Sequence, residues 1–331
     1  MKINTQDIVL FHVGGSLGSY GPIDSIINTF PKKCVVFGFE AREEEKDKTI
    51  NSILTSKGVR INLLNAFIGE EDGKSQEFYI NKHPESSSAF PPNPEVLDEV
   101  ISVPYVGIPT WRENTILERK LIFKTNSLRK IIAEYGVVPD VLSVDAQGSE
   151  LGIFKGTGDY LKEINALVSE VEFYEIYLGQ GLYGDQAALL HDAGFRLVEI
   201  FSSQYWHPLV SSGKGLLTVG EALWFKGVDS FMRTRADDPD FIIKGIKLAA
   251  IAYSFKRYSY AYQLLKRLIS QRGEEVVGQC KEYGFDILLD MLVRLDKKSA
   301  KGFSNQCFVK AFFAKVINKI RSILLALLEI K

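Results

Sequence analysis

Residues 6–41 read QDIVLFHVGGSLGSYGPIDSIINTFPKKCVVFGFEA, and within this stretch two short apolar runs flank a glycine-rich turn. The runs at 8–13 and 34–39 have the length and composition of buried strands. Between them, apolar side chains recur with helical spacing at Ile23, Ile26, Ile27 and Phe30. The stretch therefore predicts a strand, a glycine turn, a helix and a second strand that ends on Glu40.

The glycine turn and Glu40 together indicate a ligand site. Glycine lets the backbone turn tightly and approach a ligand closely, and the start of the following helix offers free N–H groups. An acid at the end of the second strand can accept hydrogen bonds from ribose hydroxyls. We therefore expect a nucleotide-type cofactor across the first two strands. A βαβ unit that binds no ligand is the alternative that this stretch alone leaves open.

Composition and charge divide the chain near residue 230. The 331 residues are 46% hydrophobic and 24% charged, which is an ordinary balance for a globular protein. Residues 230–331 carry 19 Lys and Arg against 10 Asp and Glu, whereas the rest of the chain carries 21 against 31. This asymmetry predicts two domains, 1–229 and 230–331. The three cysteines form no CxxC pair, which suits a reducing compartment.

Strands and helices alternate along the first domain. Apolar runs predict further strands at 60–68, 76–80, 140–144, 166–174, 195–201 and 221–227. Only a loop separates the last two, so we expect them to be antiparallel. The prediction is an α/β fold: a mostly parallel sheet with an antiparallel last strand and helices on both faces. Ligands bind such sheets at the carboxyl ends of the strands, where His12, Glu40 and Asp145 stand.

One long segment, residues 81–115, breaks this alternation. It is rich in proline and serine, and we expect it to be irregular. Long loops inside a compact domain are often functional, so one interpretation is a lid or an acceptor-binding loop. The other interpretation is a surface excursion without a role.

Several motifs of residues 7–229 are similar to those of one enzyme family. VLSVDAQGSELGIFKG (141–156) is similar to a strand-borne D-x-E-G-x-E element, and 166–201 contains segments like E-V-E-F, Y-x-G-Q and G-F-x-L in order. HVGGSLG (12–18) is similar to D-V-G-x-x-x-G, and the pair Phe39-Glu40 is similar to F-E. In these motifs and their order, the chain resembles the FkbM family of S-adenosylmethionine-dependent methyltransferases.

This resemblance implies a class I, Rossmann-like methyltransferase fold for residues 7–229, and the helical pattern of the residues after them adds a C-terminal all-α module. It implies S-adenosylmethionine as the cofactor, with its methionine end at the glycine turn, its ribose at Glu40 and its adenine near Ala66. It also implies O-methylation of a hydroxyl on a sugar, glycan or natural product. The cofactor-binding residues that we expect are His12, Gly14, Gly15, Ser16, Gly18, Glu40, Ala66 and Asp145.

Three positions depart from the family pattern. His12 replaces an acid that faces the amino end of the cofactor, Gln147 replaces the acid of D-x-E-G, and Asn126 stands where the family tends to have Asp. A titrating His12 would make cofactor binding weaker or dependent on pH. A methyltransferase-fold binding protein with impaired catalysis is therefore the main alternative to an enzyme. A dinucleotide-dependent oxidoreductase is less favoured, because a complete G-x-G-x-x-G is absent from the turn.

Methyl transfer to a hydroxyl is helped by a base within hydrogen-bond reach of the acceptor. Asp145 is the first candidate, because it ends the central strand beside the expected methyl group. Glu170 and Glu172, which share one face of the next strand, are second, and Glu150 in the following helix is third. Asp145 with other acids could hold Mg²⁺, but no spacing in the sequence demands a metal.

The last hundred residues are helical in pattern, and 308–330 is amphipathic with a cationic face. Packing on its own domain or on a second subunit is the favoured interpretation of this helix, and contact with an anionic membrane surface is the second. Scattered lysines without a nucleic-acid-binding fold argue against nucleic acid as a partner. With no signal-peptide pattern or membrane-length apolar run, we expect a cytoplasmic protein, peripheral at the inner membrane surface in the second interpretation.

Overall fold

The structure is a computed structural model that describes residues 2–14, 21–41, 54–101, 110–207, 214–235 and 238–302. The chain divides into two compact units, Met1–Ala236 and Asp237–Lys331. Three residues predicted to bind the cofactor, Gly15, Ser16 and Gly18, lie outside the described residues, as does the predicted helix at 308–330.

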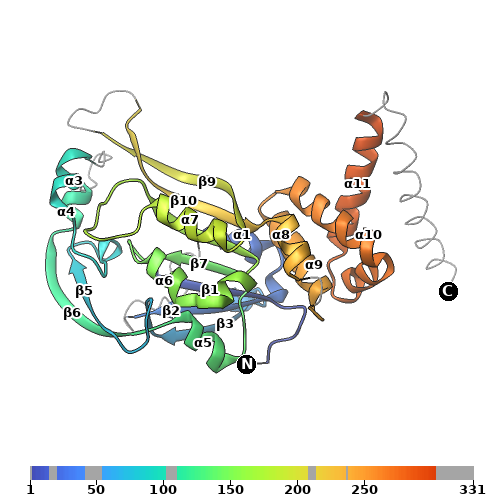
Figure 1. Cartoon of the computed structure of the whole chain (residues 1–331), viewed down its shortest axis with the longest axis horizontal. Helices are drawn as coiled ribbons and strands as arrows, with labels where there is room; N and C mark the ends of the chain where they lie inside the picture. Colours follow the sequence, from blue (N-terminus) through green and yellow to red (C-terminus); the bar gives the residue numbers. More distant parts are fainter. Residues whose placement is uncertain are drawn as a thin grey trace. The chain divides into compact units, whose positions relative to one another are not determined.

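The first unit is built on a seven-stranded sheet with the order β3-β2-β1-β7-β8-β10-β9 (Figure 1). Parallel pairing extends from β1 through β2 to β3 on one side, and through β7 to β8 on the other. β10 is antiparallel to both β8 and β9. These features confirm the predicted class I methyltransferase sheet. The strands are β1 Ile8–Gly14, β2 Cys34–Glu40, β3 Arg60–Asn65, β7 Val141–Asp145, β8 Ala166–Glu172, β9 Phe195–Trp206 and β10 Leu216–Lys226.

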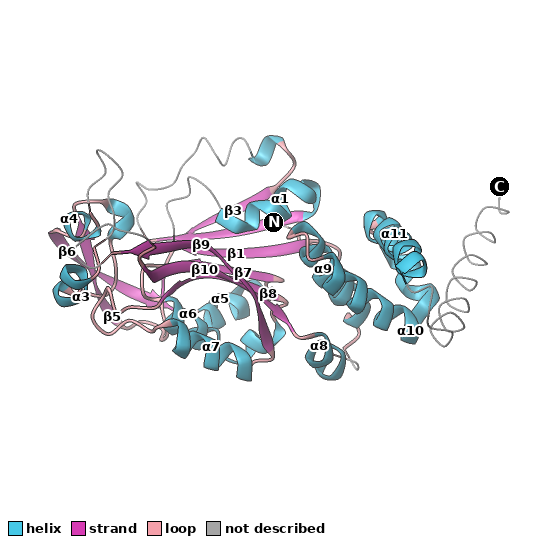
Figure 2. Ribbon diagram, turned by 90° about the horizontal axis from the view of Figure 1, so that it is seen from above, coloured by secondary structure: helices cyan, strands magenta, loops and turns pink. Residues whose placement is uncertain are grey.

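Burial on both faces explains why the central strands are predominantly apolar. All seven residues of β2, and those of β1 up to Val13, are buried. Figure 2 shows α5, α6 and α7 on one face of the sheet and α1 on the opposite face. One core cluster joins these helices to the sheet: it contains Ile132 of α5, Phe154 of α6 and Leu190 of α7 together with Phe11 and Leu142 of the strands. These helices are α1 Asp24–Thr29, α5 Leu128–Tyr135, α6 Glu150–Thr157 and α7 Tyr183–Asp192.

A second sheet of three strands, β4-β6-β5, is inserted between β3 and β7. The prediction of one strand over 60–68 is wrong, because β4 (Phe67–Ile68) leaves the first sheet and pairs with β6 (Leu117–Asn126). β5 (Ser75–Asn81) runs antiparallel to β6. The rings of Phe67, Phe78 and Phe123, one from each strand, lie 5.2–5.8 Å apart by their centroids. This aromatic packing accounts for the turn of the chain out of the first sheet.

The segment 81–115 is less irregular than the sequence predicts. It contains a 3₁₀ turn at Pro84–Ser86 and the short helices α3 (Pro94–Glu99) and α4 (Trp111–Asn114). A capping box between Thr110 and Glu113 starts α4. The next helix, α5, begins after Ser127, whose hydroxyl accepts the Lys130 N–H.

The first unit ends after one more helix, α8 (Val228–Thr234), which follows β10. Phe231 of α8 is fully buried. Arg235 donates hydrogen bonds to the backbone carbonyl oxygens of Lys162 and Glu163 in the same unit. The compact unit therefore extends to Ala236, past the boundary after residue 229 that the charge pattern predicts.

The second unit contains α9 (Phe241–Ser254), α10 (Tyr258–Glu282) and α11 (Asp286–Gly302). Its α10 is kinked at Arg272, and Gly284 takes a left-handed conformation (φ 65°) in the break before α11. Asp296 accepts hydrogen bonds from the Tyr262 hydroxyl (2.6 Å) and Lys266 Nζ (3.0 Å), which joins α11 to α10. Within the described part of the chain, the helices are too short or too polar to cross a bilayer.

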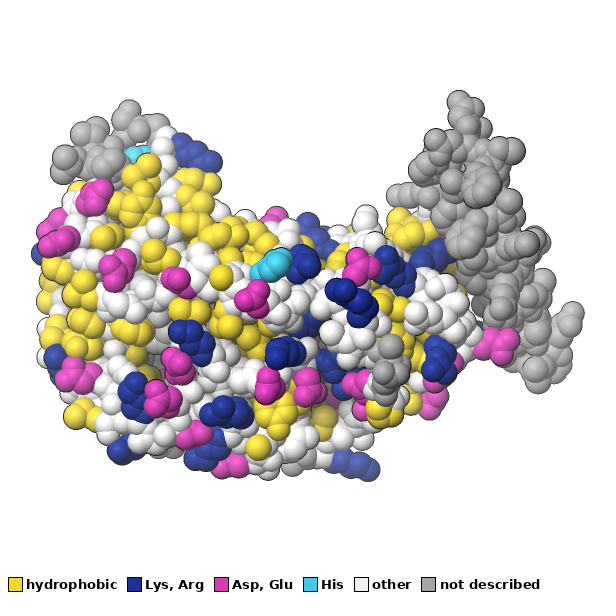
Figure 3. All heavy atoms as spheres, in the orientation of Figure 1, with side chains coloured by type: hydrophobic (Ala, Val, Ile, Leu, Met, Phe, Trp, Pro, Cys, Tyr) yellow, Lys and Arg dark blue, Asp and Glu magenta, His cyan; other side chains and the backbone are white. Residues whose placement is uncertain are grey.

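Charges of both signs are interspersed on the face drawn in Figure 3. Among the side chains coloured there, Lys and Arg alternate with Asp and Glu over the elements of each unit. The coloured Lys and Arg side chains therefore form no single basic area on the part of this face that is described.

Gly14 and Gly73 have similar left-handed backbones (φ 73° and 69°) but different surroundings. A Cβ at Gly14 would lie 2.0 Å from the Asp145 carbonyl oxygen, whereas one at Gly73 would meet nothing within 4 Å. We expect Gly73→Ala to lower the free energy of unfolding by about 1 kcal/mol through backbone strain. The Cβ of Gly14→Ala must also displace β7 from β1, so the free energy of unfolding of this variant should fall by about 3 kcal/mol or more. Urea denaturation measures both, and equal losses would contradict the close approach.

Candidate active site

A cavity of about 570 Å³ lies at the carboxyl ends of the parallel strands of the first unit. Six of the residues that the sequence predicts for the site line it: His12, Gly14, Glu40, Ala66, Asp145 and Glu170. Glu150 and Glu172 do not line the cavity and are fully buried. The second sheet and the segment between its strands β5 and β6 contribute Phe67, Phe78, Pro84, Glu85, Ser87 and Trp111.

His12 is held against the neighbouring strand at the floor of the cavity. It belongs to β1, pairs with Ser143 of β7, and places Nδ1 3.0 Å from the Ser143 hydroxyl oxygen. Only 3% of its surface is exposed, and this burial lowers the pKa of His12 to about 4. The imidazole is therefore neutral between pH 6 and 8, and a titration of His12 near neutral pH is not expected to control ligand binding.

Glu40 and Ala66 meet at one end of the cavity. Glu40 is the last residue of β2, and its carbonyl oxygen accepts the Ala66 N–H at 3.2 Å. The Glu40 side chain is 9% exposed and reaches the cavity wall. A carboxylate at the end of this strand is the group that binds ribose hydroxyls in nucleotide sites of this topology. The described side of the cavity therefore fits a nucleoside cofactor.

Gln147 joins two carboxylates with its side-chain amide. Its Nε2 donates to Asp145 Oδ1 (3.2 Å) and to Glu170 Oε2 (2.7 Å). Gln147 has a left-handed backbone (φ 48°), and the Ser88 hydroxyl donates to its carbonyl oxygen at 2.5 Å. An acid at position 147, as in the family pattern, would lack these donor N–H groups and add a third carboxylate. The glutamine is thus matched to the acids around it.

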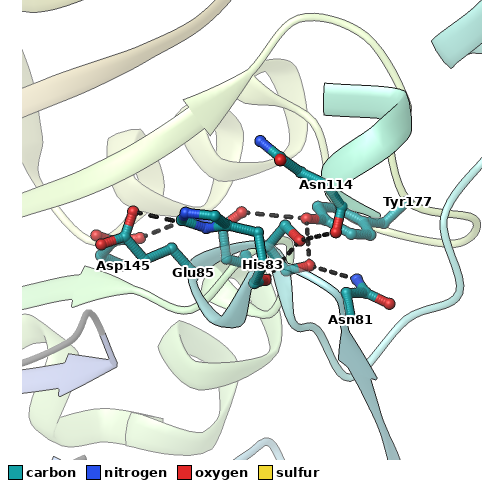
Figure 4. Close-up of polar contacts among 8 residues, drawn as sticks. Asn81, His83, Glu85, Asn114, Asp145 and Tyr177 are labelled. Atoms are coloured by element: carbon teal, nitrogen blue, oxygen red, sulfur yellow. Dashed lines mark hydrogen bonds and ion pairs between the residues drawn. The ribbon is translucent and has the colours of Figure 1, made fainter. Parts of the chain in front are cut away.

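A hydrogen-bonded chain connects this amide to the turn before α3. The Tyr177 hydroxyl lies 3.2 Å from Gln147 Oε1 and 2.8 Å from the Ser86 carbonyl oxygen, and its single proton serves one of them at a time. The same Ser86 oxygen accepts Asn81 Nδ2 at 2.6 Å. Figure 4 shows Asp145 and Tyr177 at two points of this series of hydrogen bonds, with Glu85 beside Asp145. The segment that was predicted to be irregular is therefore tied to the site.

Burial dominates the electrostatics of the acids. It raises the pKa of Asp145 and brings that of Glu150 to about 7. The pKa values of Glu170 and Glu172 lie well above their usual range, first through burial and then through neighbouring carboxylates. A carboxyl group with a raised pKa is a stronger base, so this arrangement can take a proton from a bound hydroxyl group.

Comparison with known proteins assigns the family. The model of the methyltransferase FkbM domain matches residues 12–197, which is more than half of the chain. The chain belongs to the FkbM methyltransferase family. No curated protein matches it. Among solved structures, precorrin-6y C5,15-methyltransferase from Geobacter metallireducens GS-15 matches with 13% identity and a TM-score of 0.32, over 67% of this chain and 81% of that one.

The three residues that depart from the FkbM sequence pattern do not all lie at the cavity. His12 and Gln147 line the cavity, whereas Asn126, at the end of β6, does not and accepts a hydrogen bond from Lys130 Nζ at 3.3 Å. Tyr177 and Ser86 were not predicted as site residues. Tyr177 lies in the segment similar to Y-x-G-Q, so this FkbM motif was the signal that could have identified it. His207 pairs with Ile101 through its backbone and does not line the cavity.

The low pKa of His12 links its protonation to stability. The unfolded chain binds the proton near pH 6.5 and the folded chain only near pH 4, so folding loses stability as the pH falls from about 6.5. This loss should reach about 2 kcal/mol between pH 7 and pH 5. The His12→Asn variant has no imidazole to titrate. Between pH 7 and pH 5, the free energy of unfolding of the wild type should therefore fall by about 2 kcal/mol more than that of the variant.

The measurement is the difference between the two proteins in urea denaturation at pH 7 and pH 5. Both proteins contain the same buried carboxyl groups, whose raised pKa values make stability change with pH in the opposite direction. The contribution of these groups therefore cancels in the difference. A difference that stays constant with pH would show that His12 titrates normally.

Proposed function

We propose that the chain is an S-adenosylmethionine-dependent O-methyltransferase that acts on a hydroxyl of a sugar, glycan or related natural product. The observation that supports this most is the cavity that collects Gly14, Glu40 and Asp145 from the ends of β1, β2 and β7. In this arrangement Glu40 accepts hydrogen bonds from the ribose hydroxyls, and Ala66 lies near the adenine. His12 and Gly14 lie at the methionine end.

Asp145 is the base in this proposal. The cofactor supplies an electrophilic methyl group on a positively charged sulfur. The bound cofactor would give up this methyl group to the acceptor oxygen, with the sulfur–methyl bond breaking to leave a neutral thioether. The Asp145 carboxylate would take the proton of the acceptor hydroxyl. Gln147 holds Asp145 by a hydrogen bond of 3.2 Å, and burial raises the pKa of Asp145 toward that of a useful base. Glu170, on the same amide, is the second candidate because it also lines the cavity.

The acceptor wall is formed by Phe67, Phe78 and Trp111, all of which line the cavity. Phe67 and Phe78 belong to the second sheet and Trp111 belongs to α4. The position of Trp111 supports the interpretation of the segment 81–115 as acceptor-binding. Aromatic faces and edges offer large contact areas with defined geometry. A sugar ring presents apolar C–H groups together with hydroxyls, so it fits a site that combines such rings with carboxylates.

Cofactor binding is the first test. Calorimetric titration of the whole chain should show binding of S-adenosylmethionine and S-adenosylhomocysteine but not of NAD⁺. Glu40→Gln should weaken binding about tenfold, because a neutral amide replaces a charged acceptor. Glu77→Gln, on the exposed β5, is the matched control and should bind as the wild type does. Binding of neither sulfur compound would contradict the proposal, and binding of NAD⁺ alone would favour an oxidoreductase.

Proton transfer is tested by Asp145→Asn, with transfer of labelled methyl to a panel of sugar and glycan acceptors as the readout. We expect turnover to fall about 100-fold or more, because the base is lost, while cofactor affinity changes far less. Asp159→Asn, at a fully exposed position, is the control. Unchanged turnover in Asp145→Asn would move the role of the base to Glu170. Cofactor binding without transfer to any acceptor in the wild type would favour the impaired binding protein.

A further inference from the structure

Three glutamates converge behind the wall of the cavity. Glu170 and Glu172 lie on the same side of β8, and Glu150 begins α6. One carboxylate oxygen from each residue can be chosen so that all three oxygens lie within 4.8 Å of one another. Glu150 and Glu172 are fully buried, and Glu170 reaches the cavity. We call this group the glutamate triad.

Hydrogen bonds satisfy only part of the glutamate triad. The Ala146 N–H donates to Glu150 Oε1 at 2.7 Å, and Gln147 Nε2 donates to Glu170 Oε2 at 2.7 Å. Within the described residues, Glu150 Oε2 and both carboxylate oxygens of Glu172 are buried and have no hydrogen-bond partner. A buried carboxylate without donors is strongly unfavourable unless a proton or a cation compensates it.

The charges around the triad add to this imbalance. The charged groups that act on Glu170 are the carboxylates of Asp145, Glu172, Glu150 and Glu221, all of which disfavour its ionised form. Protons can neutralise individual carboxyl groups, but each proton provides only one donor. A divalent cation contacts an oxygen of all three residues at once and offsets most of their charge.

We propose that Glu150, Glu170 and Glu172 bind a divalent metal ion that prefers oxygen ligands, of the class of Mg²⁺, Mn²⁺ and Ca²⁺. Such ions take carboxylate oxygens as ligands at about 2.0–2.6 Å, so two ligands of one ion lie at most about 4–5 Å apart. The 4.8 Å limit of the triad lies within the span of about 5 Å for an ion of the size of Ca²⁺, and is wider than the span of about 4 Å for Mg²⁺. Because Glu170 lines the cavity, an ion can enter from it and keep its remaining positions for water.

Titration of the whole chain with Mn²⁺, followed by electron paramagnetic resonance, tests the site without cofactor or acceptor. Its outcome is therefore independent of the proposed methyl transfer. We expect saturable binding of one Mn²⁺ per chain, displaced by Mg²⁺ or Ca²⁺. Glu172→Gln keeps the size of the side chain but removes a charged ligand, so it should weaken Mn²⁺ binding at least about tenfold.

Glu77→Gln serves as the matched control, because Glu77 is exposed on β5 and outside the triad. Thermal denaturation without metal checks that the variants fold, and Glu150→Gln replaces Glu172→Gln if the latter does not. No saturable Mn²⁺ binding by the wild type would overturn the proposal. Equal affinity in the wild type and in a folded triad variant would overturn it too, because the ion would then lie elsewhere.

Discussion

Much of the first unit depends on the contact between Gly14 of β1 and the backbone of Asp145 in β7. Because Gly14 has no Cβ, the Asp145 carbonyl oxygen occupies the space where one would lie. The same pairing sets His12 against Ser143 and brings Asp145 to the start of the glycine turn. The two strands that place Gly14 and Asp145 at the cavity are therefore fixed in one register.

The second constraint is the burial of several carboxyl groups at the cavity. Hydrogen bonds from the Gln147 side-chain amide reduce the unfavourable free energy of this burial. Gln147 gives its two side-chain hydrogens to carboxylates that would otherwise repel each other, and Tyr177 contacts its amide oxygen. The departure from the family acid at this position is thus consistent with a working site. His12 is compatible with the proposed cofactor in a similar way, because as a neutral imidazole it adds no positive charge at the cavity wall.

The sequence predicts those parts of the fold where pattern and chemistry agree locally. β1, β2 and β7 are short, predominantly apolar runs that end on glycine or an acid, so their place in the sheet and at the site could be inferred. The strand β6 could not be inferred, because the charged residues Glu118, Lys120 and Lys124 on its exposed side interrupt the apolar pattern of a strand. Its partner, β5, is also distant in the sequence. Spacing on β8 showed that Glu170 and Glu172 share a face, but not that only Glu170 reaches the cavity.

The second sheet has one more property: β4, β5, β6 and the helices between them all come from residues 67–126, a single continuous stretch inserted between β3 and β7. Phe67, Phe78 and Trp111 of the acceptor wall lie within it, whereas His12, Gly14 and Glu40 lie before it. In the proposed function, the acceptor and the methyl donor therefore contact separate stretches of the chain. An exchange of the inserted stretch would then change the acceptor wall and leave the strands proposed to hold the methyl donor unchanged.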